Sequence, residues 1–314
     1  MVEFRKLIAF GKSSYVVSLP KKWIERNKMK KGDSISVDIE KNKLVLSNKL
    51  EKESPEDKTI IININGKSKE QIQRLIVPAY INNFKNITLS GHELKDKGAD
   101  IRDILHGLLA LEIMEQSSEK IIARDFLDMK TIDIKSLLRK MDNITRSMMV
   151  DLNECFKEKK SHHIWDRDKD INRLSYLLFR SIKVRLNYPS LDKPYYISPE
   201  ELLKTWQWGK FIEEVGDNVK RIAKVVETTK FKKHEKCIKE LLKDVQSYYT
   251  NTMKAYYSDN KELALKLAGN KRKMMETCND LYGKKLDANN VSIIIEKIKD
   301  SAERIHHLGR LIYT

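Results

Sequence analysis

A duplication in the C-terminal half of this 314-residue chain constrains its fold more than any other feature. Residues 136–149 (SLLRKMDNITRSMM) resemble residues 240–253 (ELLKDVQSYYTNTM), and residues 211–224 (FIEEVGDNVKRIAK) resemble residues 294–307 (IIEKIKDSAERIHH). Apolar residues keep a helical spacing through these segments. The first copy is longer by about the size of residues 187–205, which contain three prolines. We therefore expect two three-helix bundles in tandem, with residues 187–205 as a loop of the first.

The duplicated segments carry two acidic residues four positions apart and an arginine four positions further on. These are Glu213, Asp217 and Arg221 in the first copy and Glu296, Asp300 and Arg304 in the second. Residues four apart share a helix face, where two carboxylates repel each other by roughly a few tenths of a kcal/mol. The arginine can relieve this repulsion as a surface ion pair worth about 0–1 kcal/mol. A bound cation that takes carboxylate oxygens as ligands is the alternative.

The N-terminal stretch FRKLIAFGKSSYVVSLPKKW, residues 4–23, predicts a hairpin followed by a short basic helix. Residues 11–14 form the predicted turn, and Pro20 suits the first turn of a helix that ends near Asn27. Every second position is apolar in residues 15–19 and 35–39, which is typical of strands with one buried face. Fifty residues with four short strands bury too little apolar surface to be stable alone, which favours the pairing of two copies.

Positive charge is concentrated in the same region. The chain carries a net charge of +16, and residues 1–52 contain thirteen Lys or Arg against six Asp or Glu. This density favours a polyanionic partner, either nucleic acid or an anionic membrane surface. Residues 21–31 are basic, but they are too few and too poor in apolar residues to anchor the chain to a membrane.

The region after residue 50 predicts a small α/β layer. Residues 51–57 (EKESPED) read as a linker. Strands are expected at 59–64, 87–89 and 120–123, and helices at 69–84 and 101–114, with Pro78 kinking or breaking the first helix. The expected order is therefore β-α-β-α-β. The segment contains no glycine-rich phosphate loop.

The N-terminal residues resemble the AbrB/MazE/SpoVT swapped-hairpin DNA-binding domain, through the order GKSS, LPKKW and KKGD followed by an alternating strand. The resemblance implies a homodimer of interlaced hairpins that binds double-stranded DNA. Carried over by position, the DNA-facing candidates are Arg5, Lys6, Lys12, Ser13, Ser14, Lys21 and Lys22. Such side chains contact phosphate oxygens, and only Arg5 and Arg26 offer bidentate readout of guanine. The alternative is that these charges form a solvated face.

The helical half resembles the PhoU family of phosphate-signalling proteins, and the chain as a whole resembles archaeal PhoU-like regulators with an AbrB-type N-terminal domain. That family binds metal clusters through E/D-x-x-x-D motifs, which implies a divalent metal, iron or zinc here. The candidate ligands are Asp168, Glu213, Asp217, Glu296 and Asp300. This chain departs from the family pattern with Asn172 in the first repeat and with Asn270 and Met274 in the second. Amides and thioethers are poor ligands for a hard cation, so the ion pair stays open as the alternative.

The expected fold class is multidomain α+β. We expect an AbrB-like domain at 1–50, a linker at 51–57, a small α/β segment at 58–130, and PhoU-like helical repeats at 131–229 and 230–314.

The expected function is a cytoplasmic DNA-binding transcriptional regulator of phosphate uptake, with the helical half as its sensor or interaction module. The alternative is an accessory protein that docks on a phosphate transporter or sensor kinase. The sequence shows no nucleophile elbow, P-loop or H-E-x-x-H motif, so no enzymatic activity is expected. Cys155, Cys237 and Cys278 form no C-x-x-C pair and are expected to be idle thiols. No apolar run approaches ~18 residues, so no membrane span is expected.

Overall fold

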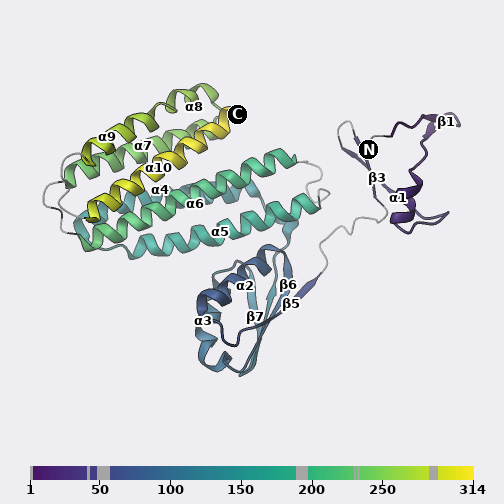
Figure 1. Ribbon diagram of the computed structural model, residues 1–314, viewed down its shortest axis with the longest axis horizontal. Coiled ribbons are helices and arrows are strands. Elements are labelled where there is room, and N and C mark those ends of the chain that lie inside the picture. Colours follow the sequence, from purple (N-terminus) through teal and green to yellow (C-terminus); the bar gives the residue numbers. More distant parts are fainter. Residues whose placement is uncertain are drawn as a thin grey trace. The chain divides into compact units, whose positions relative to one another are not determined.

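The computed structural model describes residues 3–40, 43–47, 57–188, 197–229, 231, 234–282 and 289–314 (Figure 1). The chain divides into two compact units, Met1–Glu56 and Asp57–Thr314. The first unit contains two small hairpins and one short helix. The second unit joins a four-stranded sheet with two helices to a long helical half. The expected multidomain α+β class, with a helical C-terminal half, is confirmed.

The N-terminal unit is built from two antiparallel hairpins. β1 (Ile8–Phe10) pairs with β2 (Ser14–Val16), and β3 (Ser36–Glu40) pairs with β4 (Lys43–Ser47). Gly11 turns the first hairpin with a φ of +68°, a conformation that costs glycine little because it has no Cβ. α1 (Lys21–Arg26) follows Pro20, as the sequence predicts. β2 is shorter than expected, because it ends at Val16 and leaves residues 17–19 outside the ladder.

The described residues of the N-terminal unit form no buried core. None of its residues whose exposure is described is buried. Large apolar side chains are exposed instead, among them Phe4 (95%), Ile39 (77%), Phe10 (71%) and Tyr15 (69%). This exposure agrees with the expectation that one copy buries too little apolar surface alone, since the two hairpins offer too little surface to cover one another. Burial of one face of the alternating runs by a second copy stays a prediction.

The second unit opens with a mixed sheet of strand order β5-β6-β8-β7. Its elements are β5 (Lys58–Asn63), α2 (Lys69–Ile81), β6 (Phe84–Ser90), α3 (Leu94–His106), β7 (Leu111–Gln116) and β8 (Lys120–Asp125). β5 and β6 are parallel, and the other neighbouring pairs are antiparallel. Apolar residues of the strands and of the two helices, such as Ile87, Ile121, Ile76 and Ile101, form one buried core. The layer therefore has four strands, one more than expected.

The additional strand comes from residues that the sequence assigns to a helix. The helix expected at 101–114 begins at Leu94 and ends at His106, and Leu111–Gln116 forms β7. Gly107 marks the end of the helix, and a Cβ there would lie 3.1 Å from the carbonyl oxygen of Ile104. Leu111 and Ile113 then alternate with Glu112 and pair with β8. The helix-like composition of 101–114 concealed this change from a period of 3.6 to a period of 2.

Pro78 does not break α2. The helix runs through it to Ile81, and the amide of Asn82 donates to the carbonyl of Pro78 at 2.8 Å. Ser68 and Gln71 form a capping box that fixes the start of the helix. The expected break is therefore wrong, because the proline lies close to the C-terminal end, where only one ladder bond is lost.

After the 3-10 turn η1 (Met129–Thr131), the chain is helical, with α4 (Ile134–Glu158), α5 (His162–Asn187) and α6 (Pro199–Thr228) as the first repeat. The second repeat contains α7 (Glu235–Tyr257), α8 (Lys261–Leu267), α9 (Asn270–Tyr282) and α10 (Asn289–Tyr313). α8 and α9 stand where the first repeat has the single helix α5. The long helices run side by side (Figure 1), and one apolar core continues through both repeats.

The loop expected at 187–205 ends earlier than predicted. α6 begins at Pro199, and the hydroxyl of Ser198 accepts from the amide of Glu201 at 3.1 Å while the Glu201 carboxylate accepts from the amide of Ser198 at 2.9 Å. Proline at the first helical position and this reciprocal cap are strong helix-start signals. Residues 189–196, which include the other two prolines, and most of the expected linker at 51–57 lie outside the described residues.

A buried arginine joins the sheet to the helical half. Arg180 on α5 is fully buried, and its Nε and Nη2 atoms lie 3.0 and 2.6 Å from Asn83 Oδ1. Nη2 also donates to Asp125 at the end of β8, and Lys85 Nζ contacts the same carboxylate at 2.8 Å. The guanidinium lies 4.4 Å from the ring centroid of Tyr80, in a cation–π contact. These contacts tie α2, β6 and β8 to the second helix of the first repeat.

Candidate nucleic-acid interface and acidic helical site

The seven DNA-facing candidates are all exposed in the N-terminal unit. Arg5 and Lys6 precede β1, Lys12 and Ser13 lie in the turn of the first hairpin, Ser14 begins β2, and Lys21 and Lys22 begin α1. The hairpin register pairs Phe10 with Ser14, so Lys12 and Ser13 lie in the turn between the two paired residues. Ammonium and hydroxyl groups on an exposed turn are suited to phosphate oxygens.

Some of these cations already have carboxylate partners. Arg5 pairs with Glu3, and Lys21 Nζ lies 3.7 Å from the carboxylate of Glu25. Within the described residues, Lys6, Lys12 and Lys22 make no hydrogen bond or ion pair. Lys6, Lys12 and Lys22 can therefore meet a phosphate without first leaving an internal partner. Arg5 must leave Glu3 before it can read a base, which the sequence did not suggest.

In the first helical repeat the structure brings three of the predicted acidic residues into one charged cluster. Asp217 and Glu213 come from α6, and Asp168 comes from α5. Lys220 stands between two of them, with its Nζ 2.8 Å from Asp168 Oδ2 and 2.7 Å from Asp217 Oδ1. Arg221 Nε contacts the other oxygen of Asp217 at 2.8 Å. The ion pair between Asp217 and the arginine one turn further on, expected as one alternative, is thus present.

The protonation of this cluster follows from burial and from its charges. Burial raises the pKa of Glu213 to about 7, and the negative charges of Asp217, Glu214 and Asp168 add to the rise. Burial acts in the same direction on Asp217, but Lys220 and Arg221 outweigh it and hold the pKa of Asp217 below its usual value. Glu213 is therefore partly protonated near neutral pH, whereas Asp217 is ionised.

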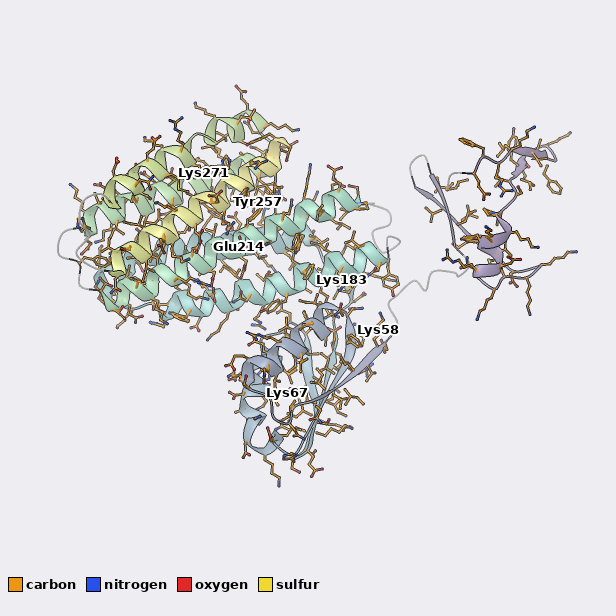
Figure 2. All side chains as sticks on the ribbon, viewed as in Figure 1. Lys58, Lys67, Lys183, Glu214, Tyr257 and Lys271 are labelled. Carbon is orange, nitrogen blue, oxygen red and sulfur yellow. The ribbon has the colours of Figure 1, made fainter. Side chains whose placement is uncertain are left out.

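The second repeat arranges its acidic residues differently. Glu296 is exposed, and Asp300 pairs with Lys297 at 3.4 Å. Arg304 does not pair with Asp300; its Nε lies 2.8 Å from Glu214 on α6 of the first repeat. The arginine of the second motif thus connects the two repeats through Glu214, which is labelled in Figure 2.

The donor set does not fit a metal ion in the part of the chain that the structure describes. No group of three or more His, Cys, Asp or Glu side chains there is arranged to hold one. Asp168 accepts from both Lys220 and Asn172 on the same oxygen, the latter at 3.2 Å. A divalent cation at this place would stand beside an ammonium group that already holds the ligand oxygens, and like charges repel.

Sequence reasoning missed Lys220, Glu214 and Arg180. Lys220 is three positions after Asp217 on the same helix, so its pairing with Asp217 could have been anticipated. Its contact with Asp168 depends on the packing of α5 against α6, which no local pattern reveals. The pairing of Arg304 with Glu214 likewise depends on the packing of α6 against α10.

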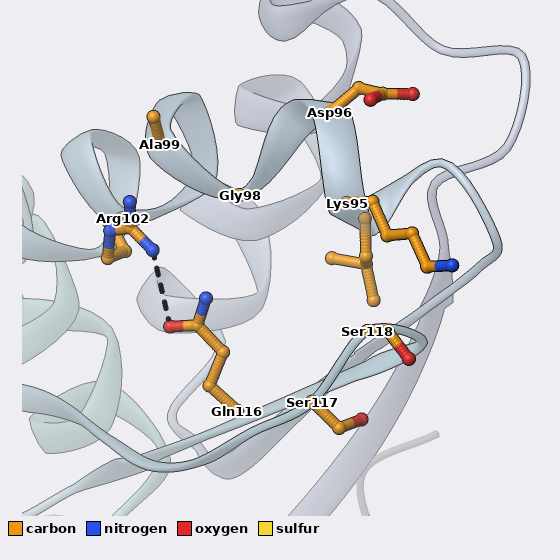
Figure 3. Close-up of a pocket in the computed structure, with 9 residues that line it drawn as sticks. Lys95, Asp96, Gly98, Ala99, Arg102, Gln116, Ser117 and Ser118 are labelled. Atoms are coloured by element: carbon orange, nitrogen blue, oxygen red, sulfur yellow. Dashed lines mark hydrogen bonds between the residues drawn. The ribbon is translucent and has the colours of Figure 1, made fainter.

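A cavity of about 590 Å³ lies in the α/β segment, between α3 and the turn that joins β7 to β8 (Figure 3). Lys95, Arg102, Ser117 and Ser118 are among its lining residues, and Arg102 Nη1 donates to Gln116 Oε1 at 3.4 Å. Its charged lining residues are exposed. A polar, open depression of this kind does not by itself identify a ligand.

None of the described helices is both long enough and apolar enough to cross a membrane.

Two family models match separate parts of the chain. Residues 8–62 match the model described as "Antidote-toxin recognition MazE, bacterial antitoxin". Residues 138–226, which cover most of α4 and α6 and all of α5, match the model of the PhoU domain. No curated protein sequence matches the chain significantly. Both expected resemblances are thus confirmed over these residues, and the chain combines a MazE/AbrB-type match at its N-terminal end with a PhoU match over the first helical repeat.

Proposed function

We propose that this protein is a DNA-binding transcriptional regulator of phosphate-responsive genes that acts as a homodimer through its N-terminal unit. The observation that carries the proposal is the N-terminal unit itself. It presents unshielded lysines and exposed apolar side chains on a MazE-type domain. The PhoU-like helical half connects the proposal to phosphate.

The apolar side chains that a single N-terminal unit leaves exposed support the proposed dimer. Phe10, Tyr15 and Ile39 each have at least two thirds of their surface exposed. Fully burying a large apolar side chain contributes about 1.5–3 kcal/mol, so a few of them can hold two short units together. A second copy would supply the same apolar residues and close the core, as the swapped hairpins of the related domain imply.

The contact with DNA would be mainly electrostatic. Lysine supplies most of the candidate positive charge, and lysine positions a protein on the phosphate backbone more than it selects a base. Each phosphate neutralised on duplex DNA contributes roughly −0.9 to the slope of log K against log salt. The N-terminal unit should therefore bind tightly at low salt and lose affinity steeply as salt rises. The helical half would act as the sensor or interaction module.

The test measures binding to duplexes from promoters of phosphate-transport genes, and to an unrelated duplex, at several salt concentrations. The full chain is compared with one that lacks residues 1–50 and with Lys12→Ala. The proposal expects a steep salt slope for the full chain, loss of binding on deletion, and a slope reduced by roughly 1.8 for Lys12→Ala, because each chain of the dimer loses one phosphate contact. Lys236→Ala is the matched control, since this lysine is exposed on α7 and should not change the slope.

Unchanged binding without residues 1–50 would sink the proposal. A flat salt dependence of the full chain would do the same. Either result would favour an accessory protein that docks on a phosphate transporter or sensor kinase through its PhoU-like half.

A further inference from the structure

We infer that the ammonium group of Lys220 occupies the position in the first-repeat acidic site that a divalent metal ion would take. By occupying it, Lys220 prevents such an ion from binding there. This goes beyond the proposed function, because it concerns the helical half alone and stands whether or not the N-terminal unit binds DNA.

Lys220 makes the connection that a bridging metal ion would make. Its Nζ contacts one oxygen from α5, on Asp168, and one from α6, on Asp217, at 2.8 and 2.7 Å. The three side chains are largely buried, with 18%, 10% and 27% of their surface exposed. An ammonium group held in this way joins the two helices through charge-assisted hydrogen bonds.

The charges of the two carboxylates that Lys220 contacts are already balanced. Asp168 and Asp217 carry two negative charges, and Lys220 and Arg221 supply two positive charges, the same total as one divalent ion. Arg221 Nε contacts Asp217 Oδ2 at 2.8 Å, and Lys220 Nζ contacts Oδ1 of the same carboxylate. A metal ion that takes carboxylate oxygens would have to displace both cations, and it would leave the Lys220 ammonium half-buried without a partner.

The surroundings hold the lysine in place. Its Nζ lies 5.7 Å from the ring centroid of Trp165 on α5, within the range of a cation–π contact. Asn172, one turn after Asp168, donates its amide to the same carboxylate oxygen that Lys220 contacts. The amide therefore contributes a donor to Asp168 where a metal site requires an acceptor.

The test removes the internal cation from the full chain. In Lys220→Met the side chain is shorter by one heavy atom and loses its charge, so Asp168 and Asp217 are left to repel each other. After chelator treatment and dialysis, this variant should bind about one Mn²⁺ per chain at least about tenfold more tightly than the wild type, and its Tm should rise by a few degrees with Mn²⁺. Adding Asp217→Asn to Lys220→Met should abolish the gain.

Lys224→Met is the matched control. Lys224 is one turn further along α6, is exposed, and lies at 5.8 Å from the same Trp165 ring, but it contacts neither carboxylate. It should behave as the wild type. Failure of Lys220→Met to gain Mn²⁺ binding would overturn the inference. If Lys220→Met does not fold, the inference is tested on the wild type. Stoichiometric Mn²⁺ binding by the wild type that Asp217→Asn removes would refute the inference. A wild-type Tm that changes with neither Mn²⁺ nor chelator would support it.

Discussion

At the scale of single residues, buried and partly buried charges make specific contacts between parts of the second unit. Arg180 joins the sheet to the helices, Lys220 joins α5 to α6, and the pair of Arg304 with Glu214 joins the two repeats. Each of these residues lies on a helix whose apolar periodicity could be predicted. The identity of the partner could not be predicted, because it is set by which helices lie side by side in the folded chain.

Arg180→Met should lower the free energy of unfolding by about 3–5 kcal/mol, because it leaves the Asp125 carboxylate and the Asn83 amide buried without their main partner. Chemical denaturation followed by circular dichroism measures the change. Arg272→Met is the control, since Arg272 is 88% exposed in its pair with Glu276 and should cost less than about 0.5 kcal/mol. Adding Asp125→Asn to Arg180→Met should recover part of the loss, and no recovery would contradict the assignment.

Glu213→Gln should remove a pH dependence from the stability of the helical half. The folded-state pKa of about 7 lies above the usual 4.5, so Glu213 contributes stability that is fully present below pH 4.5 and is lost as pH rises through about 7. The loss at pH 8 is at most about 3 kcal/mol. The variant should therefore be more stable than the wild type at pH 8 and no more stable at pH 4.5, as measured by denaturant titrations at both values.

At the scale of elements, the sequence predicted helices and strands best where neighbouring residues all favour the same structure. Gly11 and the alternation around it located the first hairpin, and Pro20 located α1. The sequence failed where two signals compete. The prolines in residues 187–205 predicted a loop, although Ser198 and Glu201 form a helix cap within that range. The apolar residues in 101–114 predicted one helix, although Gly107 separates the helix from β7. The spacing of Glu213 and Asp217 predicted an acidic cluster in the first repeat. It did not predict that Lys220 would lie between the carboxylates of that cluster.

The start of α6 offers a direct test of that capping signal. Ser198→Ala removes the hydroxyl that accepts from the amide of Glu201, which should cost about 1 kcal/mol of stability. Ser147→Ala is the control, because Ser147 lies inside α4, where alanine is the better helix former. Equal Tm values for the two variants would show that the cap contributes nothing.

At the scale of the whole molecule, the two units differ in what they can do alone. Residues 57–314 hold a continuous helical core and a separate core under the sheet. Residues 3–47, as far as their exposure is described, bury nothing. The helical half therefore has a core within a single chain, whereas the described apolar residues of the N-terminal unit are exposed and, in the proposed dimer, would be covered by the second copy. The exposure of these apolar residues could be predicted from the sequence, because so short a domain with four short strands has too little surface to form a core.

Ile39→Ser should weaken the homodimer, because it removes an apolar side chain that is 77% exposed in one chain and would be covered by the second. Sedimentation velocity should show a shift towards monomer, and DNA binding should fall with it. The matched control is Leu265→Ser, which alters a residue 56% exposed on α8 of the other unit. A dimer that persists unchanged in Ile39→Ser would contradict the proposed interface.

The missing core of the N-terminal unit has a consequence for regulation that follows from mass action. If two chains must meet before either N-terminal unit is folded, the number of assembled DNA-binding units rises with the square of the chain concentration while monomers predominate. Gene dosage then becomes an input to the response, alongside any signal that the helical half receives. If the protein binds DNA as proposed, a cell that makes little of it would leave the binding sites empty, and a moderate rise in synthesis would fill them over a narrow range of chain concentration.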